Sequence, residues 1–120
     1  MTLDEAITLS ADRDLSVEEV KMLLSSSATS SEVALNALSI DVARRYMSDR
    51  LSFQLADSLM NALWAFTVEH EDRIPSLLYS VYEAFDAGEY HHREDAPEID
   101  PEKKYTRPQI SQILGNLSEA

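Results

Sequence analysis

The chain has 120 residues, of which 44% are hydrophobic, and its formal net charge is -12 at pH 7. This length and composition suit one folded domain and are not those of a disordered chain. The negative charge argues against nucleic acid and anionic membrane surfaces as partners, because both bind lysine and arginine side chains. No cysteine is present, which excludes disulfides, thiolate metal sites and a cysteine nucleophile.

Targeting signals are the next class of feature to consider. Residues 1–5 contain neither a basic stretch nor an apolar stretch, so we expect no signal peptide. No apolar run approaches the roughly 20 residues that span a bilayer. The lack of cysteine agrees with a cytosolic protein, in which disulfides are rare. We therefore expect a cytoplasmic protein that does not enter a membrane.

Helical periodicity recurs along the N-terminal half of the chain, and alternating strand-like patterns are missing. Residues 2–5 have the form of a capping box and predict a short first helix. Residues 16–19 repeat this form and predict a second helix, through about residue 24. The serine cluster of residues 25–31 predicts a linker that ends in an N-cap, because serine hydroxyls compete for backbone hydrogen bonds. A third helix is expected over residues 32–47.

The fourth predicted helix covers residues 53–68, with Ser52 as its N-cap. Nearly every position after residue 59 is apolar in this segment. A helix that is apolar on almost all sides is buried by its neighbours. We therefore expect this helix to be the central one, with Trp64 and Phe66 as anchors of the core.

The C-terminal third predicts two more helices separated by a loop. Pro75 suits the first turn of a helix that ends at Gly88, where glycine is expected as the C′ residue. Residues 89–105 show little periodicity, are strongly acidic and contain two prolines, so we expect a long surface loop. A last helix follows, from about residue 108 to residue 116.

Together these elements predict an all-α fold. It is expected to be a compact single-domain bundle of about five to six helices over residues 1–120, with the acidic loop before the last helix. A repeat array is the alternative, because Asn36-Ala37-Leu38 matches Asn61-Ala62-Leu63. Two short matches do not establish a repeat, since a solenoid needs at least three stacked units.

Negative charge is concentrated in one part of the sequence. Eleven carboxylates lie between Glu69 and Glu102, and Arg73 and Arg93 are the only fixed positive charges in that span. A strongly negative surface attracts basic proteins and speeds their encounter. The alternative interpretation is that the charge only keeps the protein soluble.

Several tyrosines accompany the acidic segment. Tyr79 falls beside the apolar stripe of its helix, which leaves the ring partly outward. Tyrosine is enriched at interface hot spots because it buries a large area and keeps a polar tip. The alternative role of these tyrosines is to anchor the core or the loop. The predicted partner-binding residues are Tyr79, Tyr82, Glu83, Asp86, Glu89, Tyr90, Glu94, Asp95 and Glu98.

The best candidate metal ligands are His91 and His92, next to the acids of the loop. Imidazole and carboxylate together suit zinc, iron or manganese. A structural site normally closes with four ligands, however, and adjacent histidines in an extended segment point in opposite directions. We therefore expect no metal and no other cofactor, and treat these two histidines as weak candidates.

Catalytic motifs are also missing from the sequence. No serine lies in a Gly-x-Ser-x-Gly elbow, and no glycine-rich loop could cradle a phosphate. Paired catalytic carboxylates need a desolvated pocket, and Asp57 near the start of its helix is more simply a partner of the helix dipole. We therefore expect a protein that is not an enzyme.

The sequence thus predicts a small acidic helical protein that neutralises or regulates a basic protein partner. Immunity proteins and antitoxins form such a category, by analogy of surface character rather than by motif. Two alternatives remain open. One is a helical adaptor or chaperone-like module with an apolar groove. The other is a metal-dependent enzyme that uses His91 and His92.

Overall fold

The computed structural model describes residues 1–27 and 29–118 of the chain. Within these residues the chain forms helices and no strand, so the predicted all-α fold is confirmed. None of the described helices is both long enough and apolar enough to cross a membrane. In chain order they are α1 (Leu3–Ser10), α2 (Val17–Ser25), α3 (Ser31–Met47), α4 (Phe53–His70), α5 (Ser76–Ala87), the short π-helix η1 (Glu102–Thr106) and α6 (Arg107–Ser118).

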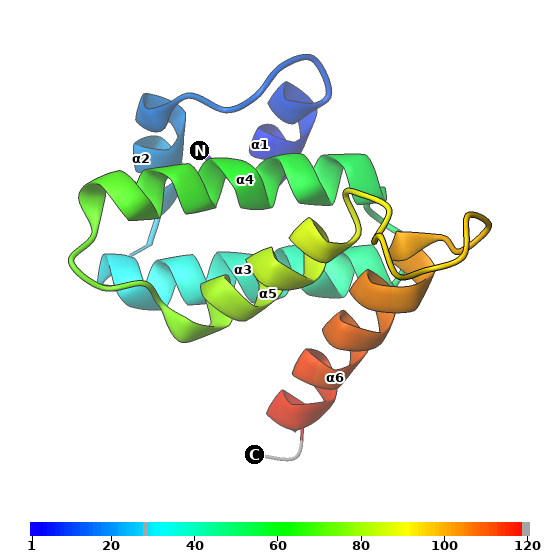
Figure 1. The fold of residues 1–120 in the computed structure, drawn as a ribbon. Coiled ribbons are helices and arrows are strands. Elements are labelled where there is room, and N and C mark those ends of the chain that lie inside the picture. The colour runs from blue at the N-terminus through cyan, green and yellow to red at the C-terminus, as the bar shows by residue number, and fades with distance from the viewer. Residues whose placement is uncertain (28, 119–120) are drawn as a thin grey trace.

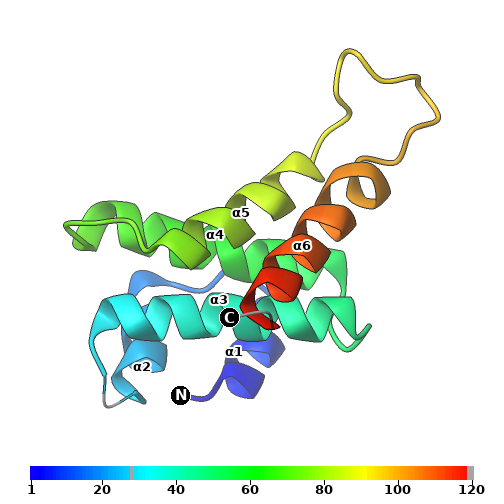
Figure 2. The same ribbon diagram turned by 90° about the horizontal axis from the view of Figure 1, so that it is seen from below.

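Helices α3, α4 and α5 pack against one another and form the centre of the bundle (Figure 1). Helices α1 and α2 cover one side of this centre, and α6 packs on α3 and α5 on another side (Figures 1 and 2). Residues 71–75 join α4 to α5, which run in opposite directions (Figure 1). The loop of residues 88–101 extends beyond the ends of the helices (Figure 2).

The first four helices begin at serine or threonine caps, as the sequence predicts. Thr2 and Ser16 each accept the N–H of the glutamate three residues later, whose carboxylate accepts the N–H of the cap in return. Ser30 and Ser52 cap α3 and α4 in the same way, without the returning glutamate. These hydroxyls provide acceptors for N–H groups that have no partner inside the helix. Local hydrogen bonds therefore fix where these helices start.

The core is centred on α3, α4 and α5 and also takes in buried side chains of α1, α2 and α6. The Phe85 ring makes an edge contact with Tyr46, with ring centroids 5.0 Å apart, and lies 6.0 Å from the ring of Phe53. The Tyr46 hydroxyl donates to Glu102 at 2.5 Å, which connects α3 to η1. These contacts join segments that are far apart in the sequence. The largest fully buried side chains include Phe85, Leu35, Leu59, Met60, Leu63, Leu78, Val81 and Ile110.

The N-terminus of α5 is capped by a side chain from another helix. Pro75 precedes α5 and provides no side-chain cap. Instead, Oδ1 of Asn36 on α3 accepts the N–H groups of Leu77 and Leu78, each at 3.1 Å. This pair of hydrogen bonds fixes the start of α5 against the middle of the bundle.

We expect Asn36→Ala to lower the free energy of unfolding by about 1–2 kcal/mol, because two N–H groups of α5 lose their acceptor. Asn36→Asp should retain more stability than the alanine variant. It keeps an acceptor oxygen and places negative charge at a helix N-terminus. Urea denaturation of the three proteins measures these differences. An alanine variant as stable as the wild type would show that this cap contributes nothing.

Gly88 ends α5 as predicted, but not through the left-handed conformation expected of a C′ glycine. Its φ of -89° lies in the right-handed region, which any residue can adopt. Close packing, and not backbone conformation, requires a residue without a side chain at position 88. A Cβ atom there would collide with Oγ1 of Thr106 and would lie 3.1 Å from the Phe53 ring. The Thr106 hydroxyl is itself fixed, because it is buried and donates to the carbonyl of Ala84 at 2.7 Å.

The predicted end of the acidic loop is wrong. The sequence predicts that the loop extends to residue 105, but residues 102–105 lie in η1, which runs directly into α6. Oδ1 of Asp100 accepts the N–H of Glu102 at 3.0 Å. Pro101 follows Asp100 and supplies a φ of -62°, which suits the first turn of a helix. The Asp-Pro pair is therefore a helix-start signal, and it places the start several residues before the predicted one.

Candidate functional site

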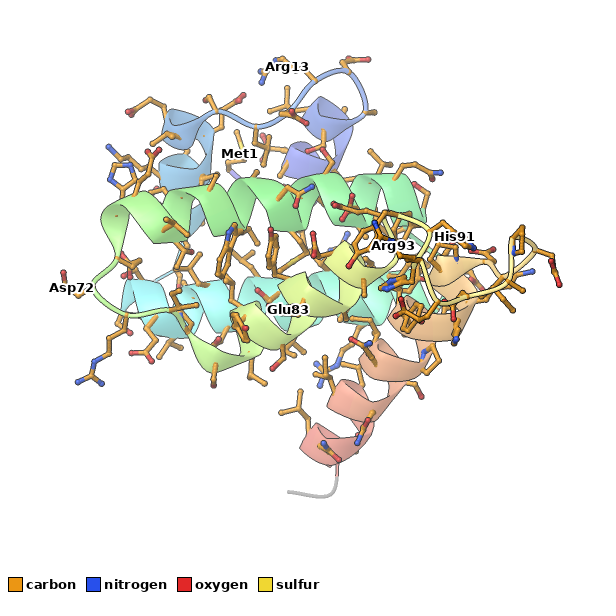
Figure 3. The ribbon with its side chains drawn as sticks, viewed as in Figure 1. Met1, Arg13, Asp72, Glu83, His91 and Arg93 are labelled. Carbon is orange, nitrogen blue, oxygen red and sulfur yellow. The ribbon has the colours of Figure 1, made fainter. Side chains whose placement is uncertain are left out.

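Two stripes of side chains meet where α4 and α5 lie side by side. On α4, Asp57, Asn61 and Trp64 are spaced by four and three residues, so they share one face of the helix. On α5 the same spacing runs from Tyr79 to Asp86. Because the two helices are antiparallel, the N-terminal end of one stripe meets the C-terminal end of the other. We call this surface the α4/α5 face (Figure 3, where Glu83 is labelled). Its residues are Asp57, Asn61, Trp64, Tyr79, Tyr82, Glu83, Asp86 and, just beyond α5, Glu89.

The middle of the α4/α5 face is an aromatic cluster of Trp64, Tyr79 and Tyr82. The rings of Trp64 and Tyr82 are stacked, with centroids 4.3 Å apart and planes 7° from parallel. The Tyr79 ring lies 6.0 Å from Trp64 at an angle of 46°. Tyr79 is 46% exposed, and the other two residues are half-buried. Trp64 is thus only partly buried: it packs against the core on one side and on the α5 tyrosines on the other, whereas Phe66 lies in the core as predicted.

Beside the aromatic cluster lies a carboxylate cluster of Asp57, Glu83, Asp86 and Glu89. Asn61 on α4 donates to Oε1 of Glu89 at 3.1 Å, which places Glu89 against the middle of α4. Oδ1 of Asp57 is buried and has no hydrogen-bond partner in the described part of the chain. Carboxyl groups from two helices and the following loop thus lie close together.

The carboxylate cluster has shifted pKa values. Burial raises the pKa of Asp57 to about 8, and the hydrogen bond and charge of Glu89 and the charge of Asp86 add to this effect. Burial, followed by the charge of Glu89, also raises the pKa of Asp86. The role expected for Asp57, a partner of the helix dipole, is therefore not its main interaction. At neutral pH Asp57 therefore holds its proton, chiefly because burial disfavours its charged form.

Cations of this chain pair with acids elsewhere. Arg45 contacts Asp41 at 3.0 Å and also reaches Asp4 on α1 at 2.5 Å. Arg13 pairs with Glu19 at 2.6 Å. In residues 1–27 and 29–118, by contrast, no member of the carboxylate cluster forms an ion pair. The α4/α5 face is therefore a place where negative charge stays uncompensated.

The predicted partner-binding residues beyond Glu89 lie on the projecting loop, and not all of them are exposed. The side chain of Asp95 is only 5% exposed, because Lys104 and the Tyr105 hydroxyl bind its carboxylate. Tyr90 is exposed and stacks on His92, with ring centroids 4.4 Å apart. The remaining predicted residues, Glu94 and Glu98, are exposed on the projecting loop. Asp95 thus fixes the loop and is not free to contact a partner.

His91 and His92 are also engaged within the loop. Nε2 of His91 lies 2.8 Å from the carbonyl oxygen of Ala96, and Nε2 of His92 lies 2.8 Å from that of Ala87. A carbonyl oxygen only accepts, so Nε2 carries the proton in both rings and only Nδ1 could bind a metal. Within the described residues, no group of three or more His, Cys, Asp or Glu side chains is placed to hold a metal ion.

An apolar cleft of about 290 Å³ lies between α1, α2 and α3. Leu23 and Leu38 are among its apolar walls, and Asp41 stands at its edge. It lies away from α5 and contains none of the predicted partner-binding residues. A cleft of this size has room for one or two side chains of a partner.

Sequence reasoning found the α5 half of the α4/α5 face and missed its α4 half. The sequence predicts other roles for the α4 residues. Asp57 is expected to interact with the helix dipole, Asn61 belongs to a repeated tripeptide, and Trp64 is expected to anchor the core. The signal that could have found them is the short connection of residues 71–75. It forces α4 and α5 to be antiparallel neighbours and so sets which positions face each other.

The chain was compared with protein-family models, curated proteins and solved structures. No protein-family model, curated protein or solved structure matches the chain.

Proposed function

We propose that this protein binds a basic protein partner through the α4/α5 face, and that it neutralises or regulates that partner as immunity proteins and antitoxins do. The observation that carries the proposal is the uncompensated carboxylate cluster beside partly exposed aromatic rings. Binding rather than catalysis is the proposed role.

Electrostatics supports a basic partner. The raised pKa values of Asp57 and Asp86 reflect an environment in which negative charge is unfavourable in the free protein. Lysine or arginine side chains of a partner would relieve this repulsion on binding. The same charges would attract the partner from a distance and raise the rate of encounter.

The aromatic cluster supports protein recognition over a diffuse attraction of counterions. Tryptophan and tyrosine dominate interface hot spots because they bury large areas with few rotatable bonds. Trp64, Tyr79 and Tyr82 already contact one another, so little conformational entropy would be lost on binding. A second cleft lies between α5 and α6, where Tyr79 and Glu83 line it. Neither this cleft nor the one between α1, α2 and α3 is lined by Asp57 or Glu89, which argues against these two acids as a catalytic pair.

The proposal predicts that neutralising the face slows association with the partner. A partner captured from the native cells at low salt and identified by mass spectrometry is purified first. Its binding rates are then measured for the wild type and for the variant Glu83→Gln, Asp86→Asn, Glu89→Gln. At about 50 mM salt the association rate should fall roughly tenfold, and the difference should shrink near 500 mM salt.

A matched control removes three charges elsewhere. The variant Asp12→Asn, Glu18→Gln, Asp72→Asn has the same net charge, and its substituted residues are exposed and lie outside the α4/α5 face. We expect its association rate to stay within about twofold of the wild type. Equal slowing by both variants would mean that only net charge matters. An association rate that does not change with salt concentration would contradict the electrostatic basis of the proposal.

The second candidate function is an adaptor-like module that uses the apolar cleft between α1, α2 and α3. Its supporting observation is the wall that Leu23 and Leu38 form there. This function predicts binding that resists salt and is lost in Leu38→Gln, whereas substitutions on the α4/α5 face leave it intact.

A further inference from the structure

We propose that the aromatic cluster selects arginine over lysine in the basic partner, with the guanidinium group stacked on the exposed rings and held by the adjacent carboxylates. This inference rests on the proposed function and names the side chain through which the partner would bind. The occupant of the α4/α5 face is then an arginine-bearing segment of a protein.

The rings form a preformed platform. Tyr82 stacks on Trp64 with nearly parallel planes, so each ring holds the other in place. Tyr79, one turn before Tyr82 on α5, packs against Trp64 and is 46% exposed. A flat cation could therefore stack on the open ring surface without a rearrangement of the helices.

The carboxylates are close enough to the tyrosine rings to change the pKa values of their hydroxyl groups. Hydrogen bonding to the Glu83 carboxylate raises the pKa of Tyr79. Burial, followed by the charges of Asp86 and Glu89, raises the pKa of Tyr82. A cation stacked on these rings would therefore be close to several acceptors for its N–H groups.

Two of the other tyrosines of the chain already have a cation of their own. The Arg107 guanidinium lies 5.3 Å from the ring centroid of Tyr46, and the Lys104 ammonium lies 5.2 Å from that of Tyr105. Within residues 1–27 and 29–118, no lysine or arginine stacks on the aromatic cluster of the α4/α5 face. The aromatic cluster therefore has no internal cation, and unlike the exposed Tyr90 of the loop it lies beside the carboxylate cluster.

Arginine suits such a site better than lysine. The guanidinium group is planar and weakly hydrated, stacks on aromatic rings and presents several N–H donors in one plane. It can lie on a ring and donate to a carboxylate at the same time. The lysine ammonium is a strongly hydrated point charge that loses more solvation on contact with a ring.

Trp64 is the only tryptophan of the chain, so its fluorescence reports on the proposed site directly. The probes are acetyl-hexaarginine amide and acetyl-hexalysine amide, which carry equal charge. At low salt we expect hexaarginine to bind about fivefold more tightly than hexalysine and to change Trp64 emission more at saturation. Tyr79→Leu should remove most of this difference, because the leucine packs on Trp64 but has no ring face.

Tyr90→Leu is the matched control, since Tyr90 is an exposed tyrosine of the projecting loop, and it should keep the preference for hexaarginine. Equal affinity and equal emission change with both peptides would overturn the arginine inference. In that case the proposed function would still stand if the triple variant Glu83→Gln, Asp86→Asn, Glu89→Gln bound both peptides more weakly than the wild type does. Binding of both peptides that calorimetry detects without any Trp64 response would overturn the inference and place their binding away from the aromatic cluster.

Discussion

Gly88→Ala is expected to lower the free energy of unfolding by about 2–3 kcal/mol, which corresponds to a fall in Tm of roughly 10 °C. The reason is a collision and not backbone strain, because the φ of Gly88 suits alanine. The added methyl group would meet Thr106 Oγ1 and the Phe53 ring at the junction of α5, η1 and α4. Thr106 has a stiff, branched side chain that is buried and hydrogen-bonded, so it cannot move aside without loss.

Two further proteins make this test specific. Gly115→Ala in α6 adds the same methyl group where nothing lies within 4 Å, so it should raise stability by up to about 1 kcal/mol through helix propensity. In a Thr106→Ala background, Gly88→Ala should cost less than in the wild type, because the colliding hydroxyl is gone. Thermal denaturation of the set gives the coupling. If both glycine variants were equally stable, close packing at Gly88 would be refuted.

Asp57→Asn is expected to stabilise the fold near neutral pH, because asparagine has the shape of the aspartic acid side chain but never ionises. The carboxyl group has a pKa of about 8 in the folded protein, against a reference value of 3.8 for the unfolded chain. Between these values the folded state binds more protons than the unfolded state, so wild-type stability falls as pH rises. The asparagine variant lacks this contribution. Its advantage should therefore grow from about pH 4 to pH 8 and then level off.

The expected gain near pH 8 is about 2 kcal/mol, after allowance for solvent screening of a half-buried group. Denaturation curves from pH 4 to pH 9 measure it. Asp72→Asn is the control, since Asp72 is an exposed carboxylate in the turn between α4 and α5 (Figure 3). It removes the same charge without relieving the carboxylate cluster. Parallel stability curves for the wild type and Asp57→Asn would contradict the account of the cluster.

The features that the sequence predicts well are those with local causes. Thr2, Ser16 and Ser52 are recognisable as caps because their hydrogen-bond partners lie within a few residues. The ion pair of Asp41 with Arg45 also has a local cause, since residues four apart share a helix face. The all-α class follows from summing such local signals along the chain.

The features that the sequence predicts poorly depend on which helices pack against each other in the folded protein. The apolar composition around Trp64 suggests complete burial, but α5 covers only part of that side of α4. Asp57 looks like an ordinary first-turn acid until α5 brings Asp86 and Glu89 beside it. Gly88 is small because η1 returns from a distant part of the chain. Each of these positions is decided by a tertiary contact that periodicity does not contain.

The central claim is that a basic partner contacts the α4/α5 face, and a footprint by NMR tests it most directly. Amide and indole N–H shifts of the isotope-labelled protein are compared before and after addition of the purified partner. We predict that the largest changes fall on the indole of Trp64 and on the amides of Tyr79, Tyr82 and Glu83. Changes concentrated at Leu23 and Leu38 in the cleft between α1, α2 and α3, with the α4/α5 face unperturbed, would contradict the account.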